Sequence, residues 1–185
     1  MDVATLQAQQ TLTIKQRFTF MVNRYEVRTT SDQLVAFAEQ KRMAFKEQVT
    51  LYADDAKKHV FAGFKARKVL DLGGAYDVTD AAGAPIGLFR KDFAASLLRS
   101  TWHVEDGAGT TTGQERSFPI ALLRRFTDIS FLPYHFDFVR NGQTIFSVEK
   151  KWGIRDKYVV TINDPHIDRR LVVSMAVALD ALQGR

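Results

Sequence analysis

Four histidines are the side chains in this sequence best suited to metal binding or proton transfer. They are His59, His103, His135 and His166, and no two of them stand four residues apart, as a helical metal-binding pair would. Because they lie far apart along the chain, only folding could bring them together. The sequence therefore predicts no metal site, and a site assembled from distant segments stays open as the alternative.

Carboxylates are sparse in the stretch where a calcium segment would be sought. The sequence NDPHIDRR, residues 163–170, has Asp164 and Asp168 as its only carboxylates. Calcium takes roughly six to eight oxygen ligands, so two carboxylates are too few for a calcium site. Asp168 is more simply explained as the N-cap of a helix that starts at Arg169.

Several enzyme signatures are missing from the chain. No glycine-rich phosphate loop follows a predicted strand, no Gly-x-Ser-x-Gly motif occurs, and Gly73-Gly74 is typical of a turn. The chain has no cysteine, which excludes disulfides, thiolate chemistry and S-acylation. We therefore predict a non-enzymatic protein without a cofactor, and we rank an enzyme last among the function classes.

The formal net charge of +5 favours anionic partners, such as phosphate-bearing lipids, nucleic acids or acidic proteins. The excess is small, however, since 26 basic residues face 21 acidic ones and are spread along the whole chain. The first ten residues, MDVATLQAQQ, contain no basic run followed by an apolar stretch, so no secretory signal is predicted. We expect a cytoplasmic protein.

Most of the sequence alternates between apolar and polar residues with a period of two, which is typical of half-buried strands. The stretch HVFAGFKARKV, residues 59–69, shows the pattern clearly. The residues predicted to share its apolar face are Val60, Ala62, Phe64 and Ala66. The residues predicted to share its outward face are Phe61, Gly63, Lys65 and Arg67.

Turn signals separate these runs about every 8–14 residues, as in a meandering antiparallel sheet or barrel. The clearest is Asn141-Gly142, which predicts a hairpin. We expect one domain over residues 1–185, with Trp102 and Trp152 in its core and a short helical turn around residues 122–126.

The end of the chain has a different pattern. Ten of the twelve residues from Leu171 to Leu182 are apolar, and they cover the whole circumference of a helix. A membrane span needs roughly 20 apolar residues, whereas a shorter run is typical of a buried core helix. A mainly β chain that ends in a helix buried on all sides predicts a closed barrel around that helix, which we place at residues 168–183. A membrane anchor is the alternative.

Several pieces of the sequence, taken in order, resemble a known group of families. They are YDVTDAAGAPIGLFRKDFAASLLRSTWHVEDG (76–107), FDFVRNGQTIFSVEKKW (136–152), YVVTIND before the apolar helix, and TLTIKQRFTFMVNRYEV (11–27). The chain resembles the LURP-one-related and phospholipid scramblase families, which share a fold with the tubby C-terminal domain. The resemblance implies a closed antiparallel β-barrel of about twelve strands around a central apolar C-terminal helix, as the periodicity also predicts.

The resemblance also implies a binding site. Tubby-like domains bind phosphoinositide headgroups through basic residues on neighbouring strands, and the matching pieces here are AGFKARK (62–68) and GLFRK (87–91). The candidate residues for an anionic or lipid ligand are Lys65, Arg67, Arg90 and Lys91. Alternatively, they are ordinary solvated charges that discourage aggregation between strands.

Scramblase activity does not carry over, because this chain lacks the proline-rich tail, the palmitoylated cysteines and the acidic calcium segment of those proteins. Two hypotheses remain in view. The first is a binding module for an anionic ligand such as membrane phospholipid headgroups, and the second is a protein-interaction or regulatory scaffold without a lipid role. No nucleic-acid partner is expected, because Phe61 is the only aromatic residue predicted beside the basic ones.

Overall fold

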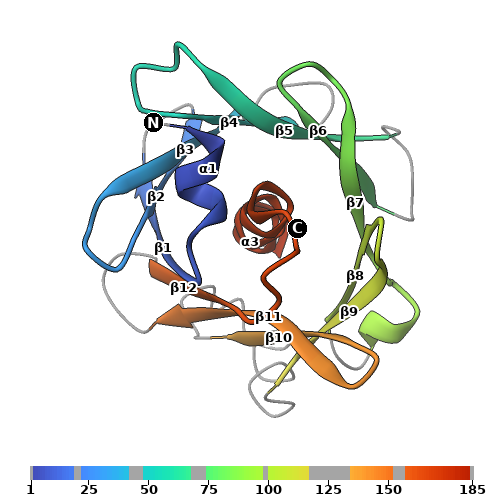
Figure 1. The fold of residues 1–185 in the computed structure, drawn as a ribbon. Helices are drawn as coiled ribbons and strands as arrows, with labels where there is room; N and C mark the ends of the chain where they lie inside the picture. The colour runs from blue at the N-terminus through green and yellow to red at the C-terminus, as the bar shows by residue number, and fades with distance from the viewer. Residues whose placement is uncertain are drawn as a thin grey trace.

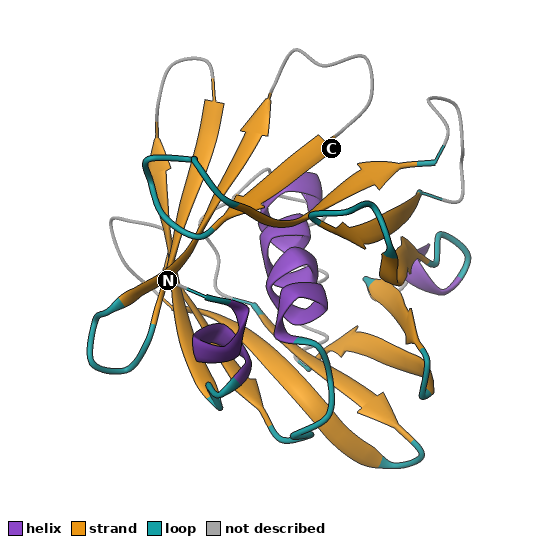
Figure 2. Ribbon diagram, turned by 45° about the horizontal axis from the view of Figure 1, so that its top comes forward, coloured by secondary structure: helices purple, strands orange, loops and turns teal. Residues whose placement is uncertain are grey.

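Twelve antiparallel strands form a closed barrel around one C-terminal helix, α3 (Figure 1). The computed structural model describes residues 2–18, 22–41, 48–67, 74–97, 100–116, 134–151 and 157–183. The view in Figure 2 shows α3 inside the barrel, with strands around it. The predicted fold class is confirmed.

Each strand lies beside the one that precedes it and the one that follows it in the sequence. The strands are β1 Thr11–Phe18, β2 Val22–Arg28, β3 Leu34–Lys41, β4 Gln48–Tyr52, β5 Val60–Ala66, β6 Ala75–Asp80, β7 Pro85–Lys91, β8 Thr101–Asp106, β9 Gly109–Glu115, β10 His135–Arg140, β11 Gln143–Lys151 and β12 Lys157–Ile162. The barrel closes where β1 pairs with β12, with Ile14 opposite Tyr158. Closure leaves no unpaired edge among these strands.

Helix α3 spans Arg169–Gln183 and is preceded by Asp168, whose carboxylate accepts a hydrogen bond from the backbone N–H of Arg170 at 2.8 Å. The residues from Leu171 to Leu179 are all buried, on every side of the helix. The predicted helix and its N-cap are therefore confirmed, and protein surrounds the apolar run. Among the described residues, no helix has the length and apolarity needed to cross a membrane.

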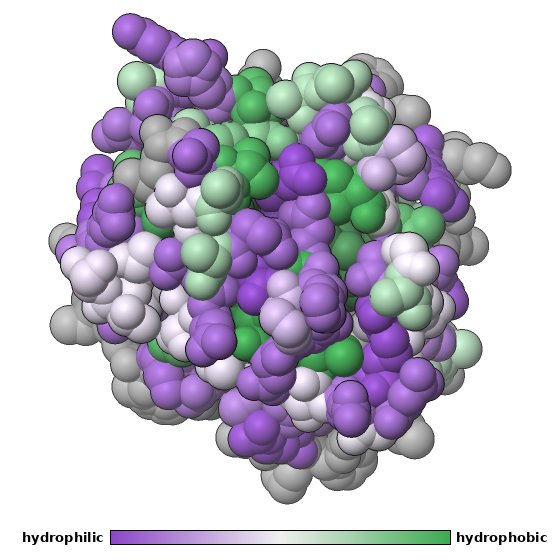
Figure 3. Space-filling view, viewed as in Figure 1, coloured by the Kyte–Doolittle hydropathy of each residue, from purple (hydrophilic) through white to green (hydrophobic). Residues whose placement is uncertain are grey.

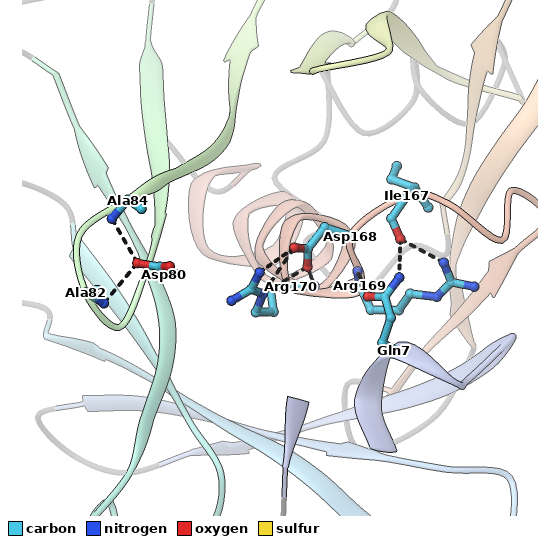
Figure 4. Close-up of polar contacts among 8 residues, drawn as sticks. All are labelled: Gln7, Asp80, Ala82, Ala84, Ile167, Asp168, Arg169 and Arg170. Carbon is cyan, nitrogen blue, oxygen red and sulfur yellow. Dashed lines mark hydrogen bonds and ion pairs between the residues drawn. The ribbon is translucent and has the colours of Figure 1, made fainter. Parts of the chain in front are cut away.

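One end of the barrel holds a second helix, α1, which spans Val3–Gln7 and lies beside α3 (Figure 1). Leu6 of α1 is buried in the core, while Gln7 reaches the start of α3 (Figure 4). The Gln7 amide donates to the carbonyl of Ile167 and accepts from the backbone N–H of Arg169. We call this end the α1 end. From the side drawn in Figure 3, apolar residues show only in small areas between polar ones.

Arg169 is buried at the junction of these elements, with 3% of its surface exposed. Its guanidinium donates to four backbone carbonyl oxygens, at distances between 2.7 and 3.1 Å. The acceptors are Gln9, Asp164, Pro165 and Ile167. Burial lowers the pKa of Arg169, and the carboxylates of Asp164 and Asp168 partly oppose that shift. One buried cation therefore holds the segment after α1, the segment before α3 and the first turn of α3 together.

Glycine at position 87 allows α3 to approach the wall of the barrel closely. A Cβ atom on Gly87 would lie 2.5 Å from the backbone oxygen of Glu105 and 2.9 Å from Cδ2 of Leu171. Both neighbours are fixed, one by strand pairing and the other by complete burial. Any larger residue here would push the helix away from β7.

The predicted inward face of β5 is wrong at its first residues. Val60 is 42% exposed, whereas Phe61 is only 5% exposed, so the two residues have exchanged the faces that strict alternation assigns to them. The reason is a bulge, because Leu51 of β4 lies opposite Ala62 while Tyr52 lies opposite Val60, and Phe61 is the extra residue. Phe61 is thus a core side chain and not an exposed aromatic beside the basic residues.

Other local predictions can be compared directly. Trp102 is buried in the core, as expected, with 1% of its surface exposed. Asn141 and Gly142 both have positive φ, at 50° and 77°, as a two-residue hairpin of type I′ requires. Trp152 and the helical turn expected around residues 122–126 lie outside the described residues.

Candidate functional site

Lys65 and Arg67 both project from the outer surface near the end of β5, as alternation predicts, and both are exposed. They line a shallow hollow of about 400 Å³ over β4, β5 and β6, together with Gln48, Asp77 and Thr79. Within the described part of the chain, Lys65 makes no ion pair. The hollow therefore presents an exposed ammonium group next to a guanidinium.

Arg67 is held by a fork-shaped ion pair with Asp77 of β6. Its Nε lies 2.9 Å from each carboxylate oxygen, and its Nη2 lies 2.7 Å from Oδ1. Both side chains are 47% exposed, so water and salt screen the pair. Exposed ion pairs generally contribute about 0–1 kcal/mol, and the exposure of this one leaves the guanidinium open to competition from another anion.

Arg90 and Lys91 end β7, as predicted, but they leave it on opposite faces. Arg90 is on the outer face, where its Nε lies 3.2 Å from Oε1 of Glu105. Lys91 is opposite Trp102 in the strand register, on the face that turns inward. Its Nζ lies 5.9 Å from the centre of the Trp102 ring and 5.7 Å from that of Phe93.

The backbone nevertheless brings three of the four predicted residues to one place. The N–H of Arg67 donates to the carbonyl of Ala75 at 3.0 Å, and Ala75 is directly opposite Arg90 across β6 and β7. A Cβ atom on the preceding Gly74 would be 3.9 Å from Cβ of Lys91 and 3.4 Å from the ring of Phe93. We call the group formed by Arg67, Arg90, Lys91 and Phe93 the β7 rim. The β7 rim lies at the barrel end opposite α1. Lys65 precedes Arg67 by two residues and lies on β5, closer to the middle of the barrel wall.

A short turn beyond β7 completes this rim, and sequence reasoning missed it. Asp92 accepts a hydrogen bond from the backbone N–H of Ala95 at 2.9 Å, at the start of the 3₁₀ turn η1, Ala95–Leu97. It also faces Nε2 of His103 at 3.1 Å. The Ala95 N–H and then His103 hold the pKa of Asp92 below its usual range. An aspartate three residues before a helical turn is a capping signal that could have been found in the sequence.

A comparison with protein families covers most of the barrel. A family model described as LURP-one-related matches residues 34–180. This chain belongs to the LURP-one-related family. The match runs from β3 almost to the end of α3 and includes all four predicted basic residues, whereas the piece at residues 11–27 lies outside it. No curated protein matches the chain.

The LURP-one-related barrel also holds a partly buried polar group that sequence reasoning did not single out. Asp180, the one carboxylate in α3, accepts hydrogen bonds from the hydroxyls of Tyr25 on β2 and Tyr158 on β12. Both tyrosines are completely buried. The aspartate was visible in the sequence, but its partners lie 155 and 22 residues away, at separations that no local pattern reports.

Burial, and then the negative charge of Asp180, raise the pKa of Tyr25 well above its ordinary value of 10. Tyr25 therefore keeps its proton in the folded state at pH values where an unfolded tyrosine loses it. The stability from this group is complete below pH 10 and falls as pH rises above it, by about 1.4 kcal/mol per pH unit. Urea unfolding between pH 9 and pH 11 should show this loss, and Tyr25→Phe should make the slope shallower. Equal slopes in the two proteins would contradict the assignment.

A second outer hollow, of about 340 Å³, lies over β9 and β10 and has the same kind of arginine–aspartate pair as the first, but no lysine in its lining. The guanidinium of Arg116 donates two hydrogen bonds of 2.8 Å to the carboxylate of Asp137, in the same way that Arg67 pairs with Asp77. The attraction of Asp137 raises the pKa of Arg116. This hollow offers a matched comparison for the first.

The positions of the histidines and carboxylates bear on the possibility of a metal site. Within the ranges that the structure describes, no three side chains of histidine, aspartate or glutamate gather as metal ligands would. Asp168 is occupied by its N-cap bond and by the guanidinium of Arg170, with the shortest contact at 2.6 Å (Figure 4). The pair raises the pKa of Arg170.

Proposed function

We propose that this LURP-one-related barrel is a binding module for anionic ligands, and that its ligand is the headgroup layer of acidic phospholipids. The observation that supports the proposal is the convergence of Arg67, Arg90 and Lys91 around Ala75, with Lys65 exposed in the adjoining hollow. In this proposal residues 1–185 act as one domain, in the cytoplasm, which attaches to a membrane peripherally.

The chemistry of the group suits phosphate. Guanidinium groups bind phosphate oxygens through two parallel hydrogen bonds, whereas an ammonium group acts as a point charge. The carboxylates of Asp77 and Glu105 preorient Arg67 and Arg90, and both ion pairs are exposed enough to reopen. Each lysine or arginine near an anionic membrane surface contributes about 1 kcal/mol of attraction, so four of them support measurable binding.

Co-sedimentation of the purified protein with vesicles tests the proposal. We expect binding to vesicles that contain acidic phospholipid, weakening as salt is raised, and no binding to neutral vesicles. Charge reversal by Lys65→Glu with Arg67→Glu should lower the affinity for acidic vesicles at least tenfold, since four units of charge change at the site.

The matched control is Lys58→Glu with Arg116→Glu. Lys58 is an exposed lysine near the α1 end, and Arg116 makes the same kind of aspartate pair as Arg67 on another part of the wall. This control changes the net charge by the same amount and should bind almost as the unchanged protein does. Equal losses in the two double variants would show that net charge alone drives binding. No binding of the unchanged protein would overturn the lipid role and favour a protein-interaction scaffold.

A further inference from the structure

Phe93 is an exception to the burial of large apolar side chains in this barrel. Phe93 is 51% exposed, and Val60 is the only other large apolar residue exposed among the described residues. The two residues that follow it, Ala94 and Ala95, are exposed as well. The tip of the turn after β7 is therefore a small apolar surface in water.

The turn that carries this tip is fixed by hydrogen bonds at both ends. The backbone N–H of Asp92 donates to the carbonyl of Thr101 at 2.9 Å, and the N–H of Ser96 donates to the carbonyl of Asp92 at 2.9 Å. The hydroxyl of Ser96 accepts from the N–H of Thr101 at 2.9 Å. Together with the Asp92 cap and its contact with His103, these bonds hold the backbone of the turn in place.

Basic residues border this apolar tip on the barrel side. The ammonium group of Lys91 lies over the face of the Phe93 ring, and Arg90 precedes Lys91 on the same strand end. Phe93 also packs against Gly74, which brings Arg67 to the same rim through Ala75. An exposed ring beside several cations has the composition of an interfacial membrane anchor, in which the apolar part lies deepest and the charges lie at phosphate level.

We propose that Phe93, with Ala94 and Ala95, inserts into the boundary between headgroups and acyl chains of an acidic bilayer, while Arg67, Arg90 and Lys91 contact the phosphates. The inference rests on the proposed lipid-binding function and adds the part of the molecule that enters the membrane. A bilayer is the occupant that fits, because one ring and two methyl groups are far smaller than the roughly 800 Å² per partner of a stable protein interface.

Two variants of the full chain test the insertion. Phe93→Trp places a fluorophore at the tip, and vesicles of acidic phospholipid with brominated acyl chains quench a tryptophan that reaches the acyl region. Phe93→Ser removes the ring. We expect bromolipid quenching in Phe93→Trp beyond that of the unchanged protein, and a roughly tenfold or greater loss of vesicle affinity in Phe93→Ser.

Val60→Ser is the control, because it removes the other exposed large apolar side chain, at the α1 end of β5. It should bind vesicles as the unchanged protein does. If Phe93→Trp binds without extra quenching and Phe93→Ser binds with full affinity, the insertion is wrong while the headgroup proposal stands. If the unchanged protein binds no acidic vesicles at all, both proposals fail together.

Discussion

Replacing Arg169 by methionine is expected to lower the free energy of unfolding by about 3–5 kcal/mol, a loss typical of removing one partner from a buried charged contact. Arg169 is 3% exposed, and its guanidinium donates to four carbonyl oxygens, all of which methionine would leave without that donor. Methionine has a similar reach, so the change removes hydrogen bonds more than volume. Urea unfolding followed by circular dichroism at neutral pH measures the effect.

The neighbouring arginine provides the matched control. Arg170 is also in the first turn of α3, but its side chain is 19% exposed and binds the partly exposed carboxylate of Asp168. Arg170→Met should cost about 1 kcal/mol or less. If both variants unfold at the same urea concentration as the unchanged protein, Arg169 does not join the segment after α1 to α3 in the way its contacts indicate.

A carboxylate at position 177 should prevent folding altogether, or lower the free energy of unfolding by more than about 4 kcal/mol. Val177 is 1% exposed, in the middle of the part of α3 that the barrel surrounds. Val177→Asp would bury a charge with no hydrogen-bond donor prepared for it. Asp180, three residues later, is only partly buried, and two tyrosine hydroxyls donate hydrogen bonds to its carboxylate.

Two further variants separate charge from size at this helix. Val177→Ala should cost about 2 kcal/mol, from lost apolar contact alone. Ala181→Asp places the same carboxylate one turn later, where the helix is only partly buried, and should cost much less. Circular dichroism and urea unfolding compare the set. A stable, folded Val177→Asp protein would mean that this face of α3 meets water.

The barrel and its central helix could be predicted from the sequence because both depend on local periodicity. Alternation reports which residues of a strand share a face, and an apolar run too short to span a membrane reports a buried helix. The error at Phe61 came from a bulge, which changes the phase of alternation without leaving a turn residue in the sequence. Contacts such as Tyr25 with Asp180 join residues 155 positions apart and leave no local pattern.

For the candidate site, too, the sequence could predict which face of a strand each residue occupies but not which residues come together. Alternation placed Lys65 and Arg67 on one outer face, and it also implies that the adjacent Arg90 and Lys91 leave β7 on opposite faces. Their convergence around Ala75 depends on strand register, which a single sequence does not specify. Phe93 was not singled out, because the sequence alone does not show whether a given phenylalanine is exposed or buried.

The seam between β1 and β12 has a consequence for how the chain acquires this shape. Thr11 pairs with Thr161, so the ring closes between residues 150 positions apart, and α3 follows the last strand. All twelve strands are therefore made before the segment that fills the barrel. Until then the apolar inner faces of the strands have no core to cover. Pairing between such distant residues slows folding, so during synthesis this chain should depend on chaperones that hold exposed strands apart.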